Sequence, residues 1–290
     1  MIDLHTHTNE SDGTYSPAQL IREAVDAGLE ALAITDHDTL AGYAAALAPA
    51  REAGLELICG IELSTKLRGR SVHLLGYFLD RDPAPAFQEW LHEMQESRRD
   101  RNVRLAARLR SMGMDVRLEE AQAKGHGMTG RPHFAQVMVE KGYVADARQA
   151  FDDYLDEAAP GYVPRLEPQF QEGIERIRAA GGLAVLPHPV RVAAGRHIEE
   201  SLPEMCEMGL GGLEAFHSDH TADEAEYYLA LARKHGLAVG GGSDFHGDLK
   251  PGLRLGSGYE GNLNVPRWVL EDLREAARRL TPQPLGGRPR

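Results

Sequence analysis

Short apolar runs alternate with longer amphipathic segments over much of the chain, a pattern typical of alternating strands and helices. In the first third, the runs at 2–5, 29–35, 55–63 and 71–79 predict strands, and 16–28 and 39–53 predict helices. Ser16 and Pro17 are typical of a helix start, whereas Gly28 and Gly54 are typical of helix ends. This succession favours a parallel sheet or barrel.

The middle of the chain has a different pattern. Charged helical periodicity runs from residue 83 to about 110, and shorter helices are predicted at 117–124, 132–141 and 146–155. The alternation then resumes, with strands expected at 183–186, 212–216 and 237–240, and helices at 169–180, 199–208, 222–235 and 266–280. We therefore expect about seven strands in a barrel formed by 1–84 and 166–290, with 85–165 as a helical insertion. The Pro/Gly/Arg-rich tail, 281–290, is expected to be frayed.

Composition narrows the class of protein. The chain has 290 residues, 42% of them hydrophobic, and a formal net charge of −12. That charge argues against binding to long duplex nucleic acid or to anionic membranes. No apolar run approaches the ~20 residues that span a bilayer, and no signal-peptide pattern opens the chain, so we expect a cytoplasmic protein. Cys59 and Cys206 are expected to be buried thiols and not a disulfide.

Histidines and carboxylates recur where the predicted strands end. Because the ends of barrel strands converge on one face, these side chains are expected to gather there. Several imidazoles and carboxylates in one place repel or desolvate each other unless cations hold them, so the pattern predicts a multinuclear metal site. The candidate ligands are His5, His7, Asp12, His37, Glu62, His73, His188, Asp244 and His246.

Spacing refines these assignments. His5 and His7 are two residues apart on a strand end, so both point to one side, and Asp244 and His246 repeat that spacing. Glu62 follows a hydrophobic run, where a carboxylate is costly unless coordinated, and we expect it to bridge two cations. Asp12 alone would be a turn former, but its place five residues after His7 favours a ligand.

Other positions leave alternatives open. Asp36 or Asp38 is expected to hold the His37 ring, although Asp38 with Thr39 is equally typical of a helix cap. His73 has the alternative of a satisfied core histidine. His217 ends a strand, and either metal or substrate contact or a structural role fits it. The remaining histidines on polar segments are expected to be solvated, namely His92, His126, His197, His220 and His235.

The mixture of imidazole and carboxylate ligands without cysteine favours Mn²⁺, with Zn²⁺ or Fe²⁺ as alternatives. Clusters of such ions generate hydroxide near neutral pH and clamp phosphoryl oxygens. The ordered motifs resemble the polymerase and histidinol phosphatase (PHP) family, on the set His5-Thr6-His7, Asp36-His37, Glu62, His73, His188 and Asp244-Phe245-His246.

This resemblance implies a distorted seven-stranded (β/α) TIM-like barrel with two to three divalent ions. One ion would be held by His5, His7, Glu62 and Asp244. A second would be held by Glu62, His73 and His188, and a third by Asp12, His37 and His246.

A narrower resemblance is carried by Ser11-Asp12-Gly13 and by Gly130-Arg131-Pro132-His133-Phe134. Both motifs are similar to bacterial 3′,5′-nucleoside bisphosphate phosphatases, which also act as 5′→3′ exonucleases on short RNA. The resemblance implies that the insertion covers the barrel mouth, with Arg131 and His133 on a substrate phosphate. Arg131 has the alternative of a helix-start arginine before Pro132. Tyr162 and Arg165 are further candidates.

We therefore expect hydrolysis of the 3′-phosphate of a nucleoside bisphosphate, with His217, Arg131 and Asp36 as catalytic residues. Three alternatives stay open. A histidinol-phosphate-type or other small phosphomonoesterase needs only one phosphate pocket. An exonuclease on longer DNA is disfavoured by the acidic charge, which still permits short single strands. A non-catalytic regulatory module is disfavoured because all nine ligand positions are present.

Overall fold

A computed structural model describes residues 1–125, 127–194 and 198–280. The expectations for the tail and for His126 and His197 lie outside these residues. Seven strands form one sheet in sequence order. They are β1 (Ile2–Asp3), β2 (Ala31–Ile34), β3 (Glu56–Leu67), β4 (Arg70–Phe78), β5 (Leu183–Leu186), β6 (Gly212–His217) and β7 (Ala238–Gly242).

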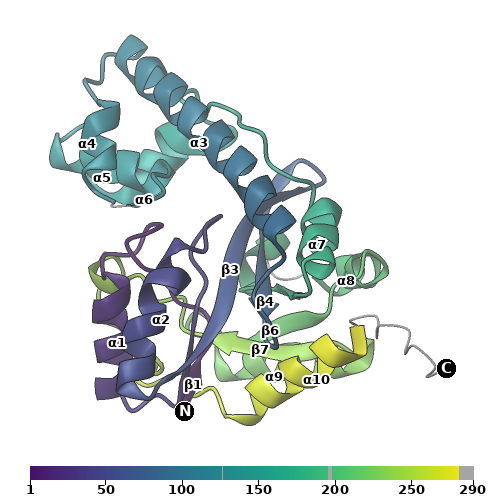
Figure 1. The fold of residues 1–290 in the computed structure, drawn as a ribbon. Coiled ribbons are helices and arrows are strands. Elements are labelled where there is room, and N and C mark those ends of the chain that lie inside the picture. The colour runs from purple at the N-terminus through teal and green to yellow at the C-terminus, as the bar shows by residue number, and fades with distance from the viewer. Residues whose placement is uncertain (126, 195–197, 281–290) are drawn as a thin grey trace.

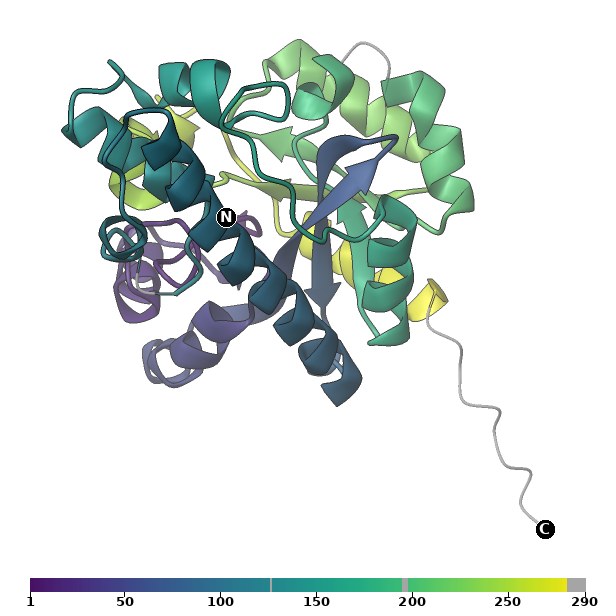
Figure 2. The same cartoon turned by 90° about the horizontal axis from the view of Figure 1, so that it is seen from above.

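The sheet curves until its last strand meets its first (Figure 2). Leu4 N–H donates to the carbonyl of Gly241 at 3.2 Å, and Thr6 bridges to Phe245 in parallel. Glycine at 242 permits this approach, because a Cβ there would lie 2.3 Å from the backbone nitrogen of His5. The prediction of a distorted seven-stranded α/β barrel is confirmed.

One strand contradicts the expectation of a parallel sheet. β4 runs antiparallel to both β3 and β5, whereas the other neighbours are parallel. Arg68 and Gly69, with φ of 50° and 80°, make the tight turn that joins β3 to β4 as a hairpin, so no helix crosses over between them. The reversal places the beginning of β4 beside the end of β3. His73, near the beginning of β4, therefore pairs with Ser64 of β3.

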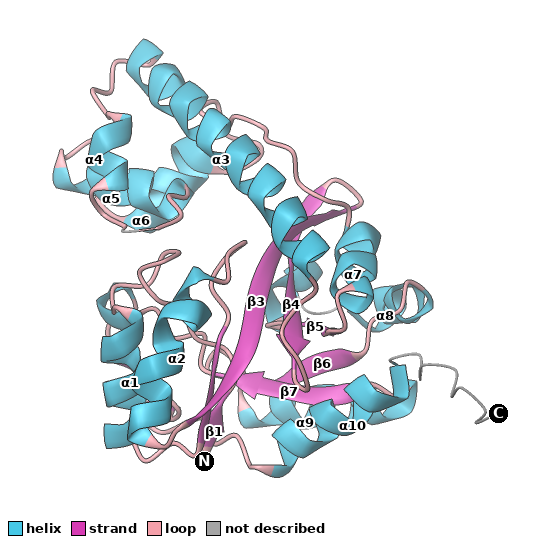
Figure 3. Cartoon of the chain, viewed as in Figure 1, coloured by secondary structure: helices cyan, strands magenta, loops and turns pink. Residues whose placement is uncertain are grey.

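Helices cover the outside of the barrel (Figures 1 and 3). They are α1 (Pro17–Asp26), α2 (Ala41–Ala53), α7 (Phe170–Ala179), α8 (Ile198–Glu207), α9 (Ala222–His235) and α10 (Trp268–Leu280). Short 3₁₀ turns η2 (Pro189–Ala194) and η3 (Gly247–Leu249) follow β5 and β7. The sequence pattern did not indicate the small hairpin of β8 (Leu253–Arg254) and β9 (Gly258–Tyr259).

Between β4 and α7, the described residues form helices and loops above the barrel (Figure 3). They include α3 (Pro85–Ser111), α4 (Leu118–Gln122), α5 (Arg131–Glu140), α6 (Ala147–Ala150) and the π-helical turn η1 (Phe151–Leu155). None of the described helices is long and apolar enough to cross a membrane.

Helix α3 connects two hydrophobic cores. Near its start, Phe87, Trp90 and Leu91 pack into the barrel core. Near its end, Leu105 and Leu109 pack into a separate cluster built from α3 to η1. One long helix therefore fixes these helices over the end of the barrel where the candidate ligands lie. Both cysteines are free; Cys59 is buried as expected, but Cys206 is only partly buried.

Candidate metal centre and arginine-lined cavity

All nine candidate metal ligands lie together at one end of the barrel. Ligand atoms of His5, His7, Glu62 and Asp244 lie within 4.8 Å of one another, and this foursome is the one predicted for the first ion. A second group joins Asp12, His37 and His246 with His7. The two groups share His7. A third group joins Glu62 and His73 with His37, whereas the resemblance had placed His188 with them. His188 also contacts Glu62, so the nine residues form one continuous cluster.

Glu62 occupies the middle of this cluster. Its Oε1 lies 2.9 Å from His73 Nδ1 and 2.9 Å from His188 Nε2. Its Oε2 lies 3.1 Å from His7 Nε2. The two oxygens thus face different sets of imidazoles, which is the arrangement of a carboxylate that bridges two cations.

The charge of the cluster also calls for cations. Burial opposes ionisation of Glu62, but the surrounding imidazoles, His73 first among them, hold the pKa of its carboxyl well below the usual range. The pKa of Asp12 is also lowered, because the neighbouring imidazoles outweigh the opposing effect of burial.

Burial lowers the pKa of His37 to about 3 and of His188 to about 4, so both rings are neutral at pH 7. Burial also opposes protonation of His5 and His7, but the carboxylates beside them raise the pKa of His5 and bring that of His7 to about 9. A bound metal ion would displace such protons.

Orphaned ring nitrogens test whether metal ions fit. Buried nitrogens without a hydrogen-bond partner include both ring nitrogens of His7 and Nδ1 of His37. Buried polar atoms are nearly always satisfied, so lone pairs converging without partners are the expected state of a ligand set. The residues present therefore fit divalent metal ions.

A buried carboxylate missed by the sequence analysis orders two of the histidines. Glu214, on β6, is fully buried and lies 3.0 Å from His5 Nδ1. Its other oxygen accepts the backbone N–H of His188 at 2.7 Å. A proton held on His5 Nδ1 leaves Nε2 free to bind a metal, which is how carboxylates beside metal ligands act. The signal was present, since a Glu inside an apolar strand needs a partner.

Backbone strain is concentrated at the same place. Asp38, His188 and Asp244 have φ of 54°, 30° and 56°, a region that non-glycine residues rarely occupy. Each follows the end of a barrel strand. Such strain persists only where the surroundings hold it, and it gathers at functional sites.

Asp36 and Asp38 act differently from the expectation that one of them holds the His37 ring. Asp36 accepts the backbone N–H of Thr8 at 2.7 Å and the Ser11 hydroxyl at 2.7 Å, so it orders the loop that leads to Asp12. Asp38 accepts the N–H of Ser64 and pairs with Arg98 and Arg165. Because Arg98 lies on α3, Asp38 ties the barrel to the helices above it.

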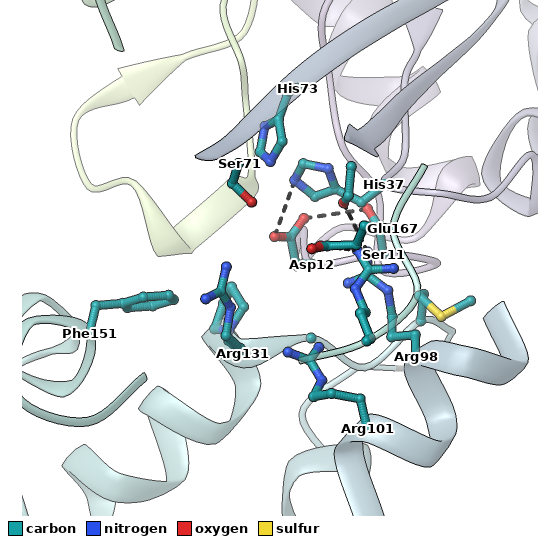
Figure 4. Close-up of a pocket in the computed structure, with 15 residues that line it drawn as sticks. Ser11, Asp12, His37, Ser71, His73, Arg98, Arg101, Arg131, Phe151 and Glu167 are labelled. Atoms are coloured by element: carbon teal, nitrogen blue, oxygen red, sulfur yellow. Dashed lines mark hydrogen bonds and ion pairs between the residues drawn. The ribbon is translucent and has the colours of Figure 1, made fainter. Parts of the chain in front are cut away.

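A cavity of about 230 Å³ lies between the cluster and those helices. Asp12, His37 and His73 line one side, and arginines from α3 and α5 line the other (Figure 4). A further arginine comes from the loop between η1 and α7. The arginines are Arg98, Arg101, Arg131 and Arg165.

Two of these arginines form no ion pair with a carboxylate among the described residues, although Glu167 also lines the cavity. Arg101 is 4% exposed, and its Nε donates only to the side-chain oxygen of Asn102. Burial, together with Arg98, Arg165 and Arg131, holds the pKa of Arg101 well below its usual range. Arg131 donates to the carbonyl of Leu155 at 3.0 Å. A buried cation in this state is stabilised by an anionic ligand.

The remaining predicted residues are placed as follows. His133 is 1% exposed, accepts the N–H of Gly130, and is not among the cavity-lining residues. His217 is buried at the edge of the metal-ligand cluster, close to His5 and Glu214. His220 was expected to be solvated but is buried, because its ring packs on Tyr228 and contacts the Ala215 carbonyl. His92 is exposed as expected, and His235 is partly buried.

A (β/α) barrel with clustered histidines and carboxylates at one end defines the class of metal-dependent hydrolases. The PHP domain family model matches residues 3–162. The chain belongs to the PHP family, and it is a metal-dependent phosphoesterase.

Similar proteins agree in length and fold. A 5′-3′ exoribonuclease from Haemophilus influenzae is 34% identical over 84% of this chain and 89% of that protein. A 3′,5′-nucleoside bisphosphate phosphatase from Chromobacterium violaceum is 34% identical over 88% of this chain and 90% of that protein. A solved amidohydrolase from Chromobacterium violaceum, with bound sulfate and no metal, has a TM-score of 0.82 at 32% identity and covers 95% of this chain and 96% of its own.

Proposed function

We propose that the protein hydrolyses the 3′-phosphate of nucleoside 3′,5′-bisphosphates and releases the nucleoside 5′-monophosphate. The observation that carries this proposal is the two-sided cavity, with candidate metal-ligand side chains on one wall and arginines on the other. Two of these arginines, Arg101 and Arg131, form no ion pair among the described residues. A substrate with two phosphates separated by a sugar satisfies both walls at once. The similar phosphatase from Chromobacterium violaceum supports the same substrate class.

We propose that the nine residues of the cluster hold two to three divalent ions, with Glu62 between the ions. Mn²⁺ is the preferred metal, and Zn²⁺ or Fe²⁺ are the alternatives. When bound, such ions activate water and neutralise phosphoryl oxygens. The oxygen- and imidazole-rich ligand set supports this order of preference, because Mn²⁺ accepts carboxylates and imidazoles together.

His217 is proposed to protonate the leaving 3′ oxygen. Its Nδ1 accepts the backbone N–H of Asp219 at 3.0 Å, so a neutral ring carries its proton on Nε2. That nitrogen lies 3.8 Å from Asp244 Oδ2, at the edge of the metal-ligand cluster. A buried ring with its tautomer fixed in this way can deliver a proton in one direction.

The helices of 85–165 are proposed to form a cap that grips the second phosphate. Arg131 and Arg101 supply planar donors suited to phosphate oxygens. Arg98 and Arg165 are already paired with Asp38 and therefore fix the cap in place. Asp36 contributes by ordering the loop that carries Asp12. His133, behind the wall, supports the start of α5 at Gly130.

Short single-stranded RNA is the second proposed substrate. The similar exoribonuclease from Haemophilus influenzae favours it, and the chemistry is the same. Water bonds to phosphorus, the bond from phosphorus to O3′ breaks, and O3′ takes a proton. With a bisphosphate the products are a 5′-monophosphate and inorganic phosphate, whereas with RNA they are a 5′-monophosphate and a shortened strand with a new 5′-phosphate.

The test compares phosphate release from adenosine 3′,5′-bisphosphate, 5′-AMP, 3′-AMP and histidinol phosphate with Mn²⁺ present. The proposal predicts a strong preference for the bisphosphate, in kcat/KM, with 5′-AMP as the product. Preference for histidinol phosphate, or equal slow turnover of all four compounds, would remove the two-phosphate assignment and leave a general phosphoesterase.

A further inference from the structure

Two cations outside the arginine-lined cavity contact the metal-ligand cluster. Lys250 Nζ lies 2.6 Å from Asp244 Oδ2 and donates to the backbone carbonyl of Asp244 at 2.8 Å. Arg191 donates to the same Oδ2 at 2.9 Å. Neither residue lines the cavity that holds Arg101 and Arg131, so the mechanism described so far does not use them.

The carboxylate of Asp244 separates these cations from the metal ligands. Its Oδ1 lies 3.3 Å from His7 Nε2 and 3.5 Å from His5 Nε2. Its Oδ2 faces Lys250 and Arg191. The two cations are therefore one carboxylate away from the atoms that would hold the scissile phosphate, within the span of one nucleotide.

The cations lie on the opposite half of the barrel mouth from the cavity. The barrel residues that line the cavity follow β1 and β2 or belong to β3 and β4. Arg191 follows β5 and Lys250 follows β7. Their side chains are 42% and 25% exposed, so both cations are accessible to a ligand from solvent.

Charge at this place is incompletely balanced when a metal is bound. The single negative charge of Asp244 then serves a divalent ion as well as two cations. Arg191 also pairs with Asp219, which is partly exposed. In a chain of net charge −12, two cations kept beside the reaction centre form a local attractive point for a polyanion.

We propose that Arg191 and Lys250 form a second phosphate-binding site, which takes the strand of a short RNA on the 3′ side of the scissile phosphate. The inference rests on the proposed function. With the 5′-terminal nucleotide in the cavity and its 3′ oxygen as the leaving group, the phosphate being attacked still carries the rest of the strand. That strand has to leave the centre away from the cavity, across Arg191 and Lys250. A bisphosphate has no such continuation.

The test uses Lys250→Met and Arg191→Met in the full chain, with Lys234→Met as the matched control. Lys234 is 60% exposed and pairs with Glu199 on the outside of the barrel, so its loss changes net charge equally. The quantity measured is kcat/KM for a 5′-phosphorylated RNA trinucleotide divided by kcat/KM for adenosine 3′,5′-bisphosphate. Using this ratio cancels any general effect of the variants through Asp244.

The site predicts that this ratio falls about tenfold in each site variant and by less than twofold in Lys234→Met. Binding provides an independent readout, because a fluorescent RNA trinucleotide with bridging methylene phosphonate linkages cannot be hydrolysed. Its anisotropy-derived affinity should weaken about tenfold in the site variants. The dependence of that affinity on salt should flatten by about 0.7 in log–log slope for each phosphate that the variant no longer neutralises.

A ratio and a binding affinity that stay within twofold in both site variants would overturn the inference and restrict Arg191 and Lys250 to holding Asp244. Failure of the proposed function looks different. In that case the wild-type protein would show no preference for the bisphosphate over 5′-AMP, while binding of the phosphonate RNA would still report on Arg191 and Lys250.

Discussion

Replacing Arg101 with methionine is expected to separate function from stability. Arg101 is a buried cation whose Nε donates to the neutral side chain of Asn102. A hydrogen bond to a charged group contributes about 1.5–3 kcal/mol. At 1.4 kcal/mol for each factor of ten, removing one such hydrogen bond to the 5′-phosphate should raise KM for adenosine 3′,5′-bisphosphate by roughly 10- to 100-fold.

The same substitution should not weaken the fold. A buried charge without a charged partner is costly, and a hydrophobic residue of similar length is often neutral or stabilising. We expect the free energy of unfolding of Arg101→Met to be unchanged or about 1 kcal/mol higher. The control is Arg104→Met on the same helix, which removes an exposed guanidinium that donates to the Pro164 carbonyl; its KM should stay near that of the wild type.

The assay pairs steady-state kinetics on the bisphosphate with urea unfolding of each variant. An Arg101→Met protein with KM within twofold of wild type and an unfolding free energy lowered by about 2 kcal/mol or more would refute this reasoning. Arg101 would then be a structural residue of the helical insertion.

Four further predictions concern the metal-ligand cluster and its supports. Glu62→Gln should lose at least one divalent ion per chain by elemental analysis, and unchanged metal content would contradict its central position. Glu214→Gln should weaken Mn²⁺ binding about 10- to 100-fold in calorimetry, because His5 loses its carboxylate partner; equal affinity would contradict that role. His217→Asn should lower kcat about 10²- to 10⁴-fold with KM nearly unchanged, whereas a parallel rise in KM would indicate substrate binding instead. Asp38→Asn should lower the free energy of unfolding at pH 7 by about 3 kcal/mol. Burial opposes ionisation of Asp38, but Arg98 and Arg165 hold the pKa of its carboxyl below the ordinary 3.8. The stability difference between wild type and variant should therefore persist down to about pH 4 and shrink on further acidification. A difference that instead vanished between pH 7 and 5 would contradict the ion pair.

Eight of the nine candidate ligands could be predicted because each follows or lies within a short apolar run that is itself easy to recognise, and Asp12 could be predicted from its place five residues after His7. The order and direction of the strands then place these residues at one end of the barrel. This includes His73, although its strand, β4, runs antiparallel to its neighbours. Strand direction was not predictable from apolar pattern, since a hairpin and a crossover both leave two hydrophobic runs. The close spacing of β3 and β4 across Arg68 and Gly69 was the available indication.

The cavity wall was harder to predict. Arg98 and Arg101 lie in a helix with many arginines, and periodicity alone does not separate those that face the cavity from exposed ones such as Arg104. The distinction arises only when α3 packs on two cores. Arg191 and Lys250 were missed for a similar reason, because they meet at Asp244 from turns that follow different strands.

The most direct test of the central claim is a crystal structure with Mn²⁺ and 5′-AMP, the expected product. The two-sided cavity predicts the 5′-phosphate against Arg101 and Arg131, with the 3′ hydroxyl turned toward Glu62 and the ions. A 5′-phosphate bound directly on the ions, with the arginines unoccupied, would contradict the assignment of the two walls.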